Sequence, residues 1–254
     1  MIYRRINPPV KKIAMKQIWT IAKRELGSFY DSLMAYIMMV AFLGFSGFFT
    51  WIFGSDIFFI KQATMMPFFS IAYWTLFFFI PAITMRLFAE ENKTGTIELL
   101  LTRPVTDWQV IAGKFLATFM LILVALGLTL PYYITVASLG PVDHGSVITG
   151  YLGLMLISCA YISIGLFASS ISNNQIVAYL VALVIGIFFH IIFDLLASGL
   201  SGISGEIISF LSISQHFESI SRGVIDSRDL IFFFSVIFIG LILTEMNIIK
   251  RRIA

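Results

Sequence analysis

The chain has 254 residues, of which 59% are hydrophobic, 15% are aromatic and only 12% are charged. A soluble domain carries about 25% charged residues, so this chain has too little polar surface for a soluble globule of its size. Its net charge of +3 is small and gives no reason to expect nucleic-acid binding. The composition predicts an all-α, polytopic membrane protein with one membrane domain.

The start of the chain is basic, contains Pro8-Pro9 and has no apolar core, so we expect no cleavable signal peptide. Residues 1–15 are expected to form a disordered basic arm, and Met15 is a plausible alternative start. Across residues 16–31, apolar and basic side chains recur at helical spacing. This pattern predicts an amphipathic helix in the membrane interface, although it also fits the inner end of the first span.

Six apolar stretches are long enough to cross a bilayer as helices. The third is long enough to tilt, or to break at Pro131. Between the fifth and sixth lies an outer segment, residues 197–229, whose short apolar run predicts short re-entrant or interfacial helices. The spans are predicted at residues 33–53, 67–88, 110–136, 147–169, 175–196 and 230–249.

Lysine and arginine are distributed unevenly between the two sides of the membrane. Six spans place both termini on one side, together with the loop between the second and third spans. Of the seventeen lysines and arginines, only Lys61, Arg222 and Arg228 fall on the other side. Because positive residues favour the cytoplasmic side, both termini and this loop are predicted to be cytoplasmic.

The loop, residues 89–109, is a charged island between two apolar spans. Gly95 and Pro104 interrupt it, and residues 96–101 between them favour a helical turn or two. Glu98 lies near the start of that turn, where the helix dipole favours a negative charge. Such a helix would lie along the membrane face with its polar side in water. On these residues alone, a surface connector with no partner fits equally well.

The ordered run Arg86, Ala89-Glu90-Glu91, residues 94–102 and Pro104-Val105, followed by Gly113-Lys114-Phe115, resembles the cytoplasmic loop of ABC-2-type transporter permeases. The resemblance implies a coupling helix that docks on a separate ATPase subunit. It also implies an interfacial helix before the first span and short outer helices before the last. The residues that it assigns to the ATPase contact are Glu90, Glu91, Lys93, Thr94, Gly95, Thr96, Glu98 and Leu99.

Residues 68–70, 79–86 and 214–229 resemble a narrower group, the gliding-motility-associated (Gld) permeases of the Bacteroidetes. This resemblance implies a multi-pass protein of the bacterial inner membrane, surrounded by lipid and linked to gliding motility. A second copy or a related permease would complete the pathway. The resemblance does not indicate the substrate or the direction of transport.

The sequence lacks the motifs by which a chain of this kind would supply its own chemistry. It has no G-x-x-x-x-G-K-[ST] phosphate loop, no dinucleotide loop and no H-E-x-x-H zinc motif. Its three isolated histidines make a poor metal site. We therefore expect no enzyme activity, metal or cofactor in this chain, and ATP would bind to the partner subunit.

Charge is costly within predicted spans, and His190, Asp194 and Glu245 there need an explanation. His190 and Asp194 are four residues apart, so in an α-helix they would share a face and could pair. Asp194 is near the outer end of its span, where water can reach it. Glu245 lies within two turns of Lys250, which favours snorkelling or a salt bridge.

Two other functions remain open beside that of a permease driven by a separate ATPase. His190, Asp194 and Glu245 could instead carry protons in a secondary carrier. The chain could also be a non-transporting membrane scaffold of a larger machine. The island at residues 89–109 favours the permease, because a carrier has no need of an ATPase contact.

Overall fold

The computed structural model describes residues 10–53, 62–96, 105–200 and 202–253. Within these ranges every regular element is a helix, and six helical segments are long and apolar enough to cross a bilayer. The prediction of an all-α membrane protein with six spans is confirmed. The spans are Leu33–Trp51, Met66–Thr94, Asp107–Leu139, His144–Ile171, Gln175–Ser198 and Ser227–Arg251.

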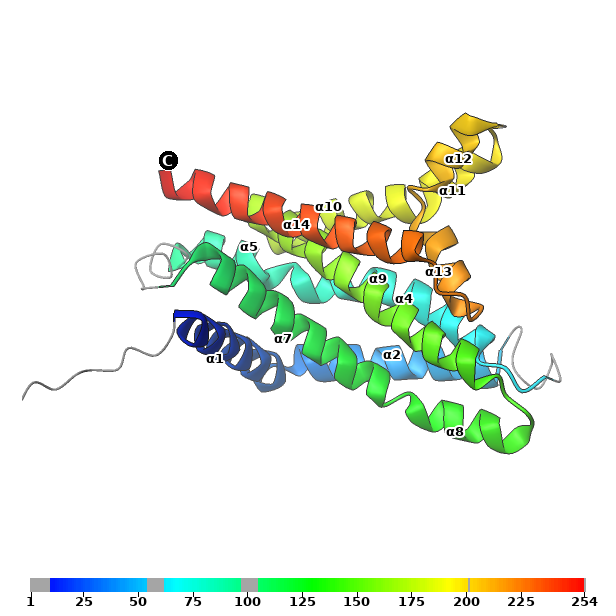
Figure 1. The fold of residues 1–254 in the computed structure, drawn as a ribbon. Coiled ribbons are helices and arrows are strands. Elements are labelled where there is room, and N and C mark those ends of the chain that lie inside the picture. Colours follow the sequence, from blue (N-terminus) through cyan, green and yellow to red (C-terminus); the bar gives the residue numbers. More distant parts are fainter. Residues whose placement is uncertain (1–9, 54–61, 97–104, 201, 254) are drawn as a thin grey trace, which may run out of the picture.

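The helices form a bundle with two distinct ends (Figure 1). The start of α1 (Val10–Asp31), the end of α5 (Arg86–Thr94), the start of α7 (Asp107–Gly127) and the end of α14 (Ser227–Ile253) gather at one end. We call it the α5 end, and the opposite one the α8 end. The α5 end is the one predicted to be cytoplasmic.

Helix α1 begins earlier than the sequence predicted. The basic arm expected at residues 1–15 is wrong from residue 10 onward, where α1 starts. Proline is favoured at helix starts, and the Lys-Lys-Ile-Ala-Met run after Pro9 and Val10 contains good helix formers. The helix packs along α7. The two approach closely at Gly113, where a Cβ atom would lie 2.6 Å from Ile21 Cγ2.

Two helices, α4 (Met66–Thr84) and α5, form the second span and meet at Met85. The first span, α2 (Leu33–Trp51), packs against α4. Gly95 ends α5 in a left-handed conformation, with φ 70° and ψ 6°. Glycine adopts this conformation without the steric cost that a Cβ imposes.

The predicted loop at residues 89–109 is wrong at both of its ends. Residues 89–94 continue the helix of the second span, because Leu, Ala and Glu near the start of α5 are strong helix formers. Residues 107–109 already belong to α7. Thr106 and Gln109 form a capping box that starts this helix, with reciprocal bonds of 3.3 and 2.9 Å between side chain and backbone.

The third span breaks near Pro131, which is one of the two outcomes that the sequence left open. Helix α7 ends at Gly127, and α8 (Leu130–Leu139) follows with the proline in its first turn. A proline there lacks only an N–H group that would have no helical partner. Thr129, between the two helices, donates its hydroxyl hydrogen to Leu126 O at 2.6 Å.

Helix α9 (His144–Ile171) is the central helix of the bundle and contacts α4, α5, α7, α10, α13 and α14. Small residues let its neighbours approach closely. The side chain of Thr84 on α4 occupies the space where Gly165 would carry a Cβ, and Phe69 does the same at Gly150. Close packing at small residues is typical of membrane helices, which gain little from burying apolar surface away from lipid.

The rest of the chain forms the fifth span, two short helices and the last span. The short helices α12 and α13 lie in the segment where the sequence predicted short helices, and Figure 1 shows α12 projecting from the bundle beside α11. The elements are α10 (Gln175–Ile187), the π-helical turn η1 (Phe188–Ile192), α11 (Phe193–Ser198), α12 (Ile203–Ser209), α13 (Ile213–Ser221) and α14.

We expect Gly165→Ala to destabilise the protein, because the new methyl group would collide with Thr84 Oγ1. Overpacking of this kind costs about 1–3 kcal/mol. Thermal unfolding in mild detergent measures the effect. The matched control is Gly127→Ala, because a Cβ at Gly127 meets no atom within 4 Å. Equal melting temperatures for the two variants would contradict the close contact between α4 and α9.

Candidate functional site

Residues of α1, α7 and α9 hold α5 in place at the α5 end. Its first contact is with Ser169 of α9. The backbone N–H groups of Phe88 and Ala89 each donate to Ser169 Oγ at 3.0 Å, and this hydroxyl donates to Met85 O at 2.9 Å. The first N–H groups of any helix lack a partner within that helix. Ser169, on a neighbouring helix, therefore supplies hydrogen-bond partners for the backbone groups at the break between α4 and α5.

A second contact joins the middle of α5 to the end of α9. Asn92 Nδ2 donates to Ser170 O at 3.2 Å and to Ser172 O at 2.9 Å. Asn247 of α14 also donates to Ser170 O, at 2.6 Å. The last carbonyl groups of α9 are thus satisfied by amides from two other helices.

The third contact is an ionic cluster around Lys114 of α7. This side chain is only 1% exposed, and its Nζ donates to Leu87 O at 2.7 Å and to Glu91 Oε1 at 2.8 Å. Glu25 Oε1 of α1 lies 3.6 Å away, and the ring centroid of Phe88 lies 5.0 Å away. A buried charge is tolerated when it is paired and hydrogen-bonded. We call Lys114, Glu91 and Glu25 the lysine cluster.

Two opposing effects determine the pKa of the Glu25 carboxyl group. Burial by itself would raise the pKa of Glu25, but the positive charge of Lys114, together with the charge and hydrogen bond of Arg24, outweighs it. The result is a pKa below the ordinary value of 4.5. The negative form of Glu25 is therefore favoured in the folded protein.

A groove of about 620 Å³ opens between α1 and α5 at this end. Asp31 and Glu90 on its walls are exposed, and neither forms an ion pair with another described residue. Arg86 lies over the ring of Phe29 at 4.8 Å. The groove is lined by Arg24, Glu25, Ser28, Phe29, Asp31, Ser32, Arg86, Leu87, Glu90, Glu91, Thr94, Thr96 and Lys114.

The structure brings together part of the predicted ATPase contact. Glu90, Glu91, Thr94 and Thr96 all line the groove, whereas Lys93 and Gly95 are exposed beside it. Glu98 and Leu99 lie outside the described residues. Lys114 entered the predictions as a positive charge on the cytoplasmic side and as part of the ABC-2 resemblance, and its burial was not predicted. Its lone position in the apolar run of α7 was the signal for a buried, paired charge.

His190 and Asp194 do not pair, which corrects the expectation from their spacing. The π-helical turn at Phe188–Ile192 contains an extra residue, shown by the bond from Phe193 N–H to Phe188 O five residues back. The two side chains find partners on different helices, His190 with Tyr161 of α9 and Asp194 with Gln215 of α13.

His190 is instead held by aromatic side chains. Its Nδ1 lies 2.6 Å from Tyr161 Oη, and its ring stacks against those of Tyr73 and Phe77 at 4.1 and 4.6 Å. Asp194 is half-buried and accepts a hydrogen bond from Gln215 Nε2 at 3.1 Å. Glu245 is half-buried near the other end of the bundle and forms no ion pair with Lys250 in the described part of the chain.

A buried pair that the sequence did not predict lies at the α8 end. His216 of α13 contacts Asp229 of α14, with 2.6 Å between Nδ1 and Oδ1, and its Nε2 lies 2.9 Å from Phe210 O. This pair ties the short helices to the start of the last span. The described residues contain no group of three or more His, Cys, Asp or Glu side chains arranged to hold a metal ion.

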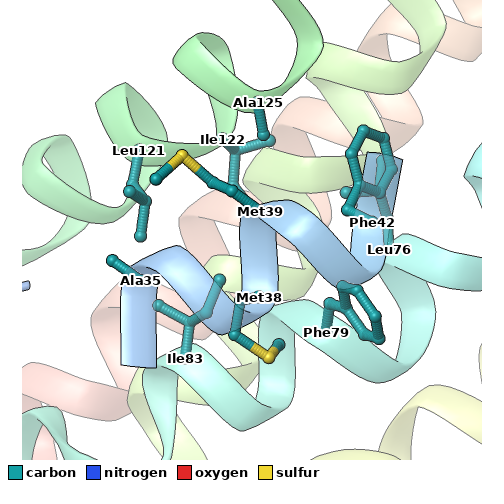
Figure 2. Close-up of a pocket in the computed structure, with 10 residues that line it drawn as sticks. All are labelled: Ala35, Met38, Met39, Phe42, Leu76, Phe79, Ile83, Leu121, Ile122 and Ala125. Atoms are coloured by element: carbon teal, nitrogen blue, oxygen red, sulfur yellow. The ribbon is translucent and has the colours of Figure 1, made fainter. Parts of the chain in front are cut away.

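An apolar cavity lies where α2, α4 and α7 meet, and Figure 2 shows the side chains that surround it. Its volume of about 20 Å³ is close to the space that a single water needs. Without a polar group in its lining, we interpret it as a packing gap. The lining residues are Ala35, Met38, Met39, Phe42, Leu76, Phe79, Ile83, Leu121, Ile122 and Ala125.

We expect Ser169→Ala to destabilise the protein by about 1–3 kcal/mol, because it leaves buried backbone groups of α5 without partners. Thermal unfolding in detergent checks this. Ser235→Ala is the matched control, since Ser235 is exposed and bonds only within its own helix, to Ile231 O. The interpretation fails if both variants unfold at the temperature of the unmodified protein.

Stability should also fall in acid because of Glu25. A carboxyl group whose pKa is lowered by folding contributes stability above its ordinary pKa of 4.5 and loses it as pH falls through the lower folded value. Melting temperatures measured from pH 6 to pH 3 should therefore decline less steeply in Glu25→Gln than in the unmodified chain. Parallel declines would show that Glu25 makes no such contribution.

Comparison with known proteins bears directly on this arrangement. Residues 19–244, most of the chain, match the profile of the family described as ABC-2 family transporter protein. No curated protein matches the chain. The matched range includes α5, the lysine cluster, the first five spans and most of the sixth. This chain therefore belongs to the ABC-2 transporter family.

Proposed function

We propose that the chain is the permease subunit of an ATP-binding cassette transporter and that a separate cytoplasmic ATPase docks at the α5 end. The observation that carries the proposal is the position of α5. This helix extends the second span beyond the apolar bundle and presents exposed charged residues beside an open groove. ATP would bind to the partner, and this chain would convert the partner's movement into movement of its spans.

The charge of the groove favours a particular kind of contact. Asp31 and Glu90 are its exposed acidic groups without an ion pair among the described residues. Basic side chains on the ATPase would complement them and steer its approach. Glu90 is the better test position of the two, because it lies on α5 within two turns of the segment at residues 94–101 that the family resemblance assigns to coupling.

Such a contact would act by displacing the helices that lead away from it. Closure of the ATPase subunits would push on residues 94–101, and rigid helices transmit a displacement made at one end. Helix α5 leads from that segment into the second span, and α7 leads from its other side into the third. The push would therefore tilt these two spans relative to α9.

The assembly and location follow from the family resemblance. A second permease, identical or related, would complete the pathway, and the mostly exposed apolar faces of α2, α10 and α14 would meet lipid or that second subunit. The chain would lie in the bacterial inner membrane with both termini in the cytoplasm. We extend the proposal to a link with gliding motility on the similarity of residues 68–70, 79–86 and 214–229 alone.

Affinity purification of the tagged protein from the bacterial membrane in mild detergent tests the proposal. We expect an ATPase to co-purify, with ATP hydrolysis measured in the eluate. Glu90→Arg should lower the recovered activity at least tenfold, because it reverses a charge on the proposed docking surface. Glu206→Arg is the matched control, since Glu206 is exposed on α12, away from the α5 end.

Each contrary result has a definite meaning. A chain that purifies without an ATPase contradicts the proposal and favours a secondary carrier or a scaffold. Equal recovery of ATPase activity in Glu90→Arg and in the unmodified protein places the docking surface elsewhere. Loss of activity in Glu206→Arg as well would show that charge reversal damages the protein without regard to position.

A further inference from the structure

The lysine cluster joins three helices that are far apart in the sequence. Glu25 lies on α1, Glu91 on α5 and Lys114 on α7. The ammonium group of Lys114 has three hydrogens. Leu87 O and Glu91 Oε1 accept two of them at 2.7 and 2.8 Å, and Glu25 Oε1 lies within ion-pair distance at 3.6 Å.

This arrangement resists separation of the three helices. Lys114 is only 1% exposed, so water cannot replace a carboxylate that moves away. Losing one carboxylate would leave the buried ammonium less fully compensated, which is unfavourable away from water. A displacement of α5 must therefore carry α7 and α1 with it, or break the cluster.

Helix α5 is held differently at its two ends. At Met85 it is separate from α4, and Ser169 bonds the backbone groups on both sides of the break. Glu91 lies about one turn before Gly95, where α5 ends. A force applied beyond Gly95 would thus reach the lysine cluster before it reached the break at Met85.

The geometry points to Lys114 as the positioning residue that transmits movement of α5 to α7 and α1. This inference rests on the proposed function, because it takes the ATPase as the source of the movement. Lys114 lines the groove but is only 1% exposed, so it would not touch the ATPase itself. Lys114 would therefore set the amplitude of the movement of α7 and α1 without affecting the docking of the ATPase.

The experiment measures the distance between α1 and α9 in the reconstituted complex of this chain with its ATPase. Lys23 on α1 and Ile171 on α9 are exposed and can be replaced by cysteine for spin labels, after Cys159→Ser removes the native cysteine. Pulsed electron paramagnetic resonance then gives the distance without nucleotide and with ATP plus vanadate. We expect a nucleotide-dependent shift in this otherwise unmodified protein.

Lys114→Gln and Lys114→Met should reduce the shift to less than half while the same amount of ATPase co-purifies. Glutamine keeps a donor for Leu87 O and so protects the fold if methionine does not. The matched control removes an exposed ion pair of similar length, Arg222 with Glu218 at 2.8 Å, by Arg222→Met. Arg222→Met should leave the shift unchanged. If Lys114→Gln melts at the same temperature as the unmodified protein, a merely structural effect is excluded.

The possible failures can be told apart. Absence of an ATPase from the unmodified complex overturns the proposed function and this inference together. A bound ATPase with no nucleotide-dependent shift in the unmodified chain overturns only the inference. It is also overturned if both Lys114 variants keep the full shift, or if Lys114→Gln releases the ATPase, which would make Lys114 a docking residue.

Discussion

A positive charge buried among helices must have its partners beside it, and the α5 end of this protein is organised around that requirement. Lys114 satisfies it with a carbonyl oxygen of α5 and carboxylates from α5 and α1. A buried charge left without any partner costs about 3–5 kcal/mol, so each group beside Lys114 helps to fix its position. The positions of α1, α5 and α7 therefore depend on one another, although each is separated from the others in the chain.

The central helix supplies the complementary constraint. Helix α9 offers glycines where α4 must come close, and serines where α5 and α14 need hydrogen-bond partners. Both features use small residues, since a large side chain at Gly165 or Ser169 would separate the helices. In lipid, contacts of this kind bind helices together more effectively than apolar area does. The bundle thus has a rigid centre and an α5 end held by polar contacts.

Much of the fold could be predicted because hydropathy and charge patterns depend only on the order of residues along the chain. The six spans, the break near Pro131 and the short helices before the last span follow from apolar length and proline chemistry. The partners of Lys114 and Ser169 could not be predicted, because they depend on which helices become neighbours. The pairing of His190 with Asp194 that their spacing allowed does not form, because each side chain meets a partner on another helix, which spacing along one segment cannot show. Where α1 begins was missed because a basic stretch next to two prolines resembles a disordered arm in the sequence.

The π-helical turn in the fifth span also affects how this sequence should be compared with its relatives. One extra residue shifts the helical phase of everything after it by about 100°. A related chain with a regular α-helix here would need one residue fewer to present the same faces beyond Phe193. Sequence alignments of the family should therefore place a single-residue gap within residues 188–192 wherever the aromatic surroundings of His190 are absent. An ungapped alignment would match side chains that face different neighbours.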